Sequence, residues 1–100
     1  MRLIWAPLAI ERAAEIVAYI AADRPDAARK WVTGLFAATR SLPKFPHRGR
    51  RVPELDRPEY RELIYGNYRV VYRVDEQRII VLTVRHGRRL LDETEILESR

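Results

Sequence analysis

The fold is decided by residues 60–89, which read YRELIYGNYRVVYRVDEQRIIVLTVRHGRR. Three runs rich in β-branched and aromatic residues follow one another here, at residues 60–65, 68–74 and 79–85. The turns between them, Gly66-Asn67 and residues 75–77, are short enough to join antiparallel neighbours. The segment therefore predicts a three-stranded antiparallel meander.

Arginines are threaded through these predicted strands. Alternation along the middle strand places Tyr68, Val70, Tyr72 and Val74 on one face, and Arg69, Val71 and Arg73 on the other. A sheet face with arginines at central positions is either solvated or an anion-binding surface. We expect hairpin pairing to gather several of these cations at one end of the sheet. The candidate partner-binding residues are Arg61, Arg69, Arg73, Arg85, Arg88 and Arg89.

The N-terminal half predicts a strand followed by two helices. Residues 2–5 suit a short strand, and Pro7 stands where the first turn of a helix tolerates proline. An apolar stripe at helical spacing follows, and we expect it to pack on the sheet through Ile10, Val17 and Ile20; its other members are Ala13, Ala14 and Ala21. After a tight connection at residues 23–26, a second helix ends before Pro43. Its expected buried residues are Ala28, Trp31, Val32, Leu35 and Leu42.

The remaining segments complete a single domain over residues 1–100. Residues 43–58 contain four prolines and predict a basic loop, and residues 90–100 suit a short C-terminal helix. The order β-αα-βββ predicts an α+β domain with a helical hairpin laid over one face of an antiparallel sheet.

Composition limits the classes of function. The chain has no cysteine, so disulfides and thiolate chemistry are excluded. Charged residues interrupt its apolar N-terminus, which argues against a signal peptide or membrane span and for a cytoplasmic protein. The net charge of +5 serves solubility or indicates an acidic partner, either nucleic acid or an acidic polypeptide.

Motifs of catalysis or metal binding are few. The two histidines, His47 and His86, are 39 residues apart with no ligand-like spacing around them, so we expect no metal site and no cofactor. Glu62 stands inside a predicted strand, where it either pairs with a cross-strand arginine or acts as a base. Pairing is the favoured interpretation.

The order of elements, the hairpin GNYRVVYRV and the closing IIVLTVRHGRR resemble the RelE/ParE superfamily of toxins from type II toxin–antitoxin modules. The resemblance covers about residues 2–91. It implies a twisted antiparallel sheet with two N-terminal helices. It also implies a cognate antitoxin whose acidic or amphipathic extended segment wraps the toxin in a hetero-oligomer.

The superfamily has two mechanisms, and the sequence leaves both open. RelE-like members cleave mRNA on the ribosome without a metal, while ParE-like members bind DNA gyrase and are not nucleases. In a nuclease, Arg69, His86 and Arg88 would surround the phosphate and Glu62 would serve as a base.

Departures from the nuclease pattern favour the ParE-like branch. Tyr60 and Glu62 stand roughly where RelE-like toxins have lysines. Leu90-Leu91 stands where those toxins have an aromatic residue that acts as a general acid. His86 is followed by Gly87, whereas the nuclease branch with a histidine has tyrosine there. We therefore expect growth inhibition through gyrase. The alternatives are a ribosome-dependent mRNA endonuclease and a non-toxic basic binding module.

Overall fold

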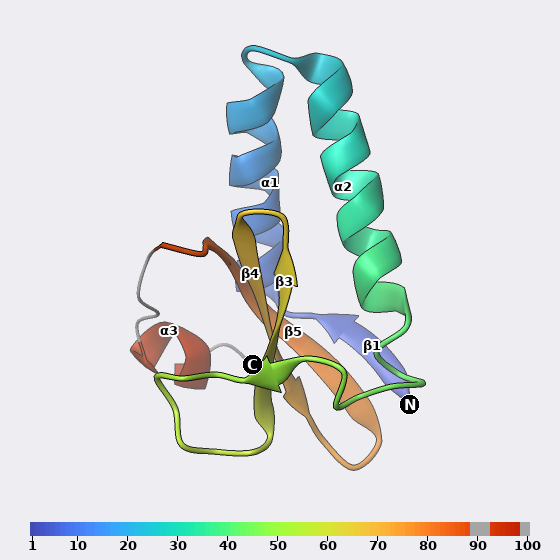
Figure 1. The fold of residues 1–100 in the computed structure, drawn as a ribbon, viewed down its shortest axis with the longest axis vertical. Helices are drawn as coiled ribbons and strands as arrows, with labels where there is room; N and C mark the ends of the chain where they lie inside the picture. Colours follow the sequence, from blue (N-terminus) through green and yellow to red (C-terminus); the bar gives the residue numbers. More distant parts are fainter. Residues whose placement is uncertain (89–92, 99–100) are drawn as a thin grey trace.

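The computed structural model of the protein describes residues 1–88 and 93–98. It confirms the predicted α+β fold: an N-terminal strand, a helical hairpin, a meander and a short C-terminal helix (Figure 1). The helices are α1 (Pro7–Ala21), α2 (Pro25–Arg40) and α3 (Glu93–Glu98). The strands are β1 (Arg2–Trp5), β2 (Arg50–Arg51), β3 (Tyr60–Tyr65), β4 (Tyr68–Val74) and β5 (Arg78–His86).

The described strands form one sheet in the order β1-β5-β4-β3-β2. β1 runs parallel to β5, and the other pairs are antiparallel. Gly66 has φ of +57°, a conformation that glycine adopts without strain, so it allows the tight turn between β3 and β4. β2 was not expected, because residues 43–58 were predicted as loop throughout. Arg50 and Arg51 pair with β3, but a strand of two residues is too short to show a strand pattern in the sequence.

A β-bulge changes the register of β5. Val71 pairs with Thr83 whereas Tyr72 pairs with Val81, so Leu82 is an extra residue on β5. A shift of one residue moves every following side chain to the opposite face of the sheet. Val84 and His86 consequently lie on the face that carries Tyr68 and Val70.

Both faces of the sheet are covered, by two separate apolar clusters. The cluster under α1 and α2 includes Leu35, Leu42, Val70, Tyr72 and Val84. The cluster on the other face includes Val52, Leu55, Val71, Leu82 and Ile96, contributed partly by the segment after β2 and by α3. The expectation of a solvated or anion-binding face around Arg69 is therefore wrong, because loop and helix residues bury that face.

The buried face of α1 differs from the expected stripe. Ala9 and Ala13 are buried and Ile16 packs against the same cluster, whereas Ile10 is 58% exposed. Small alanines let α1 lie close to β5 and α2, and Ile10 and Val17 of the expected stripe line a groove between the two helices instead. The prediction for α2 was better, since Ala28 and Leu35 are buried and Trp31 packs against the cluster. Leu42 is also buried, but in the turn after α2, whereas Val32 is only partly buried.

Candidate functional site

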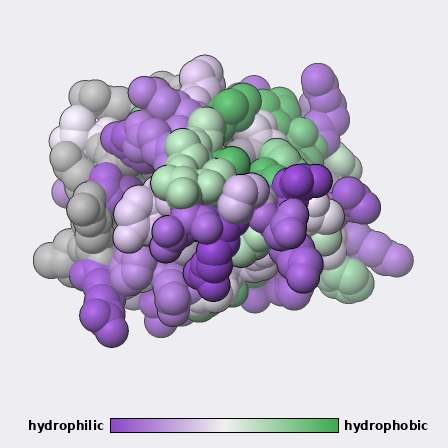
Figure 2. Space-filling view, turned by 90° about the horizontal axis from the view of Figure 1, so that it is seen from above, coloured by the Kyte–Doolittle hydropathy of each residue, from purple (hydrophilic) through white to green (hydrophobic). Residues whose placement is uncertain are grey.

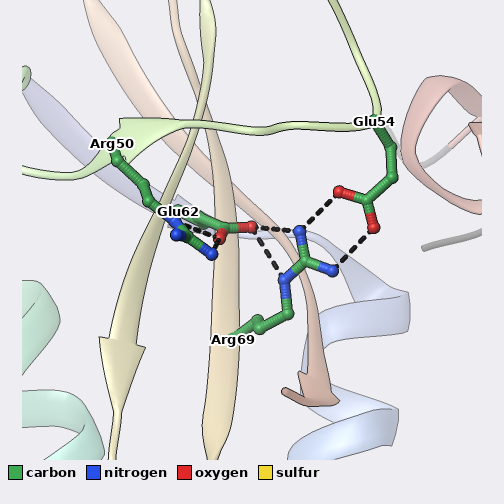
Figure 3. A network of polar contacts seen from close by, with 4 residues as sticks. All are labelled: Arg50, Glu54, Glu62 and Arg69. Carbon is green, nitrogen blue, oxygen red and sulfur yellow. Dashed lines mark hydrogen bonds and ion pairs between the residues drawn. The ribbon is translucent and has the colours of Figure 1, made fainter. Parts of the chain in front are cut away.

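Four charged side chains meet on the α3-covered face of the sheet (Figure 3). Arg69 comes from β4, Glu62 from β3, Arg50 from β2 and Glu54 from the segment between β2 and β3. Strand pairing brings three of them together, because Arg50 lies opposite Glu62, and Glu62 lies opposite Val71, two residues from Arg69. Residues two apart on a strand share a face. We call Arg50, Glu62, Arg69 and Glu54 the ion network.

Arg69 is the centre of the ion network. Its Nε and Nη2 donate hydrogen bonds to Glu62 Oε1 at 2.8 and 2.5 Å. Its Nη1 and Nη2 donate to the two carboxylate oxygens of Glu54, both at 2.7 Å. The hydrogen bond to Glu54 raises the pKa of Arg69 above its ordinary value against the opposing effect of burial, and Glu62 adds to the rise. The side chain is only 6% exposed, and all three guanidinium nitrogens are engaged.

Glu62 is buried completely and is bound by arginines from two strands. Its Oε2 accepts a hydrogen bond from Arg50 Nε at 2.7 Å and lies 2.6 Å from Arg50 Nη2 in an ion pair. A buried charge is tolerated in a fold only when it is paired and hydrogen-bonded. The network meets this requirement with two arginines and two carboxylates. Glu62 therefore takes the pairing arrangement, and its role as a base stays a prediction.

His86 lies on the opposite face of the sheet from the ion network. Its ring contacts Tyr68, with ring centroids 5.6 Å apart, and borders a hollow of about 510 Å³ between α1 and the end of β5. The backbone N–H of Arg88 donates to His86 Nδ1 at 3.2 Å. The structure thus brings Glu62 together with Arg69, and His86 together with Arg88, but it separates the two pairs by the sheet.

The bulge at Leu82 is the cause of this separation. Val74 pairs with Ile79, so an uninterrupted ladder would place Arg85 opposite Tyr68 and His86 on the face of Arg69. The extra residue instead pairs Tyr68 with His86. One inserted residue therefore decides whether His86 shares a face with Arg69.

The predicted partner-binding arginines do not all gather at one end of the sheet. Arg69 lies level with Arg85, but Arg73 is four residues further along β4, about 13 Å away. Arg61 lies opposite Tyr72, towards the same end as Arg73, and its Nη1 donates to Gly49 O at 2.9 Å. Convergence is therefore wrong for Arg61 and Arg73.

The other arginines of that set differ in their surroundings. Arg73 Nη2 lies 3.6 Å from Asp75, and Arg88 is exposed in the turn after β5. Arg89 lies outside the described residues. The role of these arginines in partner binding stays a prediction.

An apolar groove that was not predicted lies between α1 and α2. It has a volume of about 340 Å³ and is lined by Trp5, Ile10, Ala13, Ala14, Val17, Ala18, Val32 and Phe36. Figure 2 looks onto the helical-hairpin end of the molecule and shows apolar surface bordered by hydrophilic side chains. Four residues of the stripe that was expected to face the sheet line this groove. The sequence pattern therefore predicted an apolar face of α1 correctly, but much of that face borders the groove and not the sheet.

The described residues offer neither a membrane span nor a metal site. No helix of residues 1–88 and 93–98 is both long and apolar enough to cross a membrane. In the same ranges, no three histidine, aspartate or glutamate side chains are grouped so that they could hold a metal ion.

Comparisons with known proteins give the family. A family model described as the ParE toxin of the type II toxin–antitoxin system, parDE, matches residues 3–91. Among solved structures, the chain is similar to a chain of the chromosomal ParDE toxin–antitoxin system from P. aeruginosa. The TM-score is 0.73 at 21% sequence identity, and the match covers 86% of this chain and 95% of that chain. No curated protein matches the chain.

Proposed function

Because the chain belongs to the ParE toxin family of type II toxin–antitoxin systems, we propose that it arrests growth by binding DNA gyrase. Its family partner is an antitoxin, which would hold the toxin inactive in the cytoplasm until the antitoxin is lost. Gyrase is preferred to the ribosome because of how the candidate catalytic residues are arranged.

The separation of these residues by the sheet carries this proposal. Cleavage of RNA needs a base, a cation and an acid around one phosphate. Glu62 and Arg69 bind one another on one face, while His86 lies on the other face beside Tyr68. Arg69 also has its donors occupied by two carboxylates. This arrangement favours inhibition by binding over inhibition by chemistry.

Replacing His86 with glutamine should leave growth inhibition essentially intact. Glutamine keeps a hydrogen-bonding side chain of similar reach but cannot transfer a proton at neutral pH. Growth after toxin induction is the first measurement, and mapping of mRNA ends is the second. In a nuclease, the same exchange would remove a group typically worth 10²–10⁴-fold in rate.

The matched control is His47→Gln, which changes the other histidine, in the loop after α2. Equal toxicity of the wild type and both variants, with mRNA intact, supports the gyrase proposal. Codon-specific cuts made by the wild type and by His47→Gln, but lost in His86→Gln, would refute it.

We propose that the antitoxin places apolar side chains in the groove between α1 and α2, and carboxylates against Arg73 or Arg88. Ile10 is half-exposed in the groove, so Ile10→Asp should weaken the toxin–antitoxin complex by roughly tenfold or more with little effect on toxin stability. Titration calorimetry or surface plasmon resonance measures the affinity. Tyr19→Asp is the matched control, because Tyr19 lies on the same helix but outside the groove. A larger loss for Tyr19→Asp than for Ile10→Asp would place the antitoxin elsewhere.

A further inference from the structure

The positive charge of the chain is concentrated in one segment. Residues 27–53 contain seven lysines and arginines and no aspartate or glutamate. The other 73 residues carry 12 basic and 14 acidic residues, so this segment accounts for the whole positive excess. It runs from the first turn of α2 through the following loop to β2. We call residues 27–53 the basic segment.

Much of this charge is not neutralised within the protein. Arg29, Arg50 and Arg51 each pair with a carboxylate. Lys30, Arg40, Lys44 and Arg48 are exposed and make no ion pair within the part of the chain that the structure describes. Unpaired cations at this density create a positive field that attracts an extended anion.

Three of the unpaired cations cluster where α2 ends. Arg48 Nη1 donates to Ser41 Oγ at 2.6 Å and to Ala38 O at 3.5 Å, which ties it to the last turn of the helix. Arg40 occupies that turn. The negative end of the helix dipole is sufficient reason for these two arginines. The helix dipole does not explain Lys44 or the exposed aromatic residue Phe45 that follows it.

Phe45 is 56% exposed at the tip of this cluster, with Lys44 Nζ 5.8 Å from the centre of its ring. The loop beneath it is fixed to the sheet. The buried Tyr72 hydroxyl donates to Pro46 O at 2.8 Å and accepts from Gly49 N–H at 2.9 Å. A cation-rich loop that is held rigid presents the ring to solvent without the ordering cost that a flexible loop would incur on binding.

We propose that the basic segment, centred on Arg40, Lys44, Phe45 and Arg48, is a DNA-binding surface that contacts backbone phosphates without reading sequence. Cations combined with an exposed aromatic ring are the combination by which proteins hold nucleic acid irrespective of sequence. An acidic peptide would dock through apolar side chains, and the groove between α1 and α2 offers more of these than the loop, where only Phe45 and Pro46 are apolar among the residues that line its hollow. This inference rests on the proposed function, because the DNA that the surface would contact is the DNA bound by gyrase.

The test is fluorescence anisotropy of purified toxin with a labelled 20-base-pair DNA duplex, with one strand of it, and with an RNA strand of the same sequence, in the absence of gyrase. Four phosphate contacts, by Lys30, Arg40, Lys44 and Arg48, predict a log–log salt slope near −3.6, and therefore a loss of affinity of roughly 10²-fold between 50 and 200 mM salt. Arg40→Gln/Lys44→Gln should reduce that slope by about 1.8. Phe45→Ala should weaken binding of the single strand more than that of the duplex. Arg48 is left in place because it holds the loop.

The matched control is Arg24→Gln/Arg57→Gln, which removes the same charge from exposed positions outside the basic segment. The inference is supported if the affinity for the duplex or for the single strand falls in the Arg40/Lys44 variant and not in this control. No binding at 50 mM salt, equal losses in both double variants, or tighter binding of an RNA strand than of the DNA strand would overturn it. DNA binding without inhibition of gyrase would refute the proposed function but not this inference. Inhibition of gyrase without DNA binding would refute this inference but not the proposed function.

Discussion

Replacing Glu62 with alanine should lower the free energy of unfolding by about 3–5 kcal/mol. Glu62 has no exposed side-chain surface and accepts hydrogen bonds from Arg50 and Arg69. Its removal takes from Arg69, which is nearly as buried, one of the two carboxylates that bind it among the described residues. The cost of an incompletely compensated buried charge is therefore larger than the loss of the hydrogen bonds themselves.

Urea unfolding followed by the fluorescence of Trp5 and Trp31 measures this loss. Asp56→Ala is the matched control, because it breaks the exposed pair of Asp56 with Arg51 and should cost less than about 1 kcal/mol. The double exchange Glu62→Leu/Arg69→Met removes both buried charges, so it should cost clearly less than the two single exchanges added together. A loss below about 1 kcal/mol for Glu62→Ala would show that the ion network does not hold the sheet and loop together.

Truncating Leu35 to alanine should cost about 2–5 kcal/mol. Leu35 is fully buried in the cluster that joins α2 to the sheet, and α2 packs nearby on α1. The exchange removes apolar contacts and leaves a cavity that the two rigid helices can fill only in part. The same urea unfolding experiment measures it.

Thr33→Ala, on the exposed side of the same helix, should change stability by no more than about 0.5 kcal/mol. A similarly small change for Leu35→Ala would mean that α2 presents a different face to the sheet.

The sequence predicted the elements of this fold well because the strong signals are local. Short turns at Gly66-Asn67 and residues 75–77 bound the meander, and prolines at positions 7 and 25 mark where α1 and α2 begin. The buried face of α1 was assigned wrongly because alanine and isoleucine are both apolar. Periodicity gives the direction of a stripe but does not say whether the sheet or a groove receives it.

The candidate site was less predictable because it depends on long-range register. Glu54 is in a loop, and nothing near it in the sequence indicates that it reaches Arg69. The bulge at Leu82 has no marker in the sequence, yet it places His86 on the opposite face from Arg69. Residue types alone therefore suggested a nuclease set that the register of the sheet divides.

The most direct measurement compares purified wild-type toxin and His86→Gln in two parallel reactions: DNA supercoiling by gyrase, and the integrity of mRNA on translating ribosomes. Addition of the antitoxin to each reaction controls for contaminating activities. The proposed function predicts that both proteins inhibit supercoiling equally, that the antitoxin relieves this inhibition, and that the mRNA stays whole. Cleavage of ribosome-bound mRNA by the wild type that disappears in His86→Gln, with supercoiling unaffected by either protein, would contradict it.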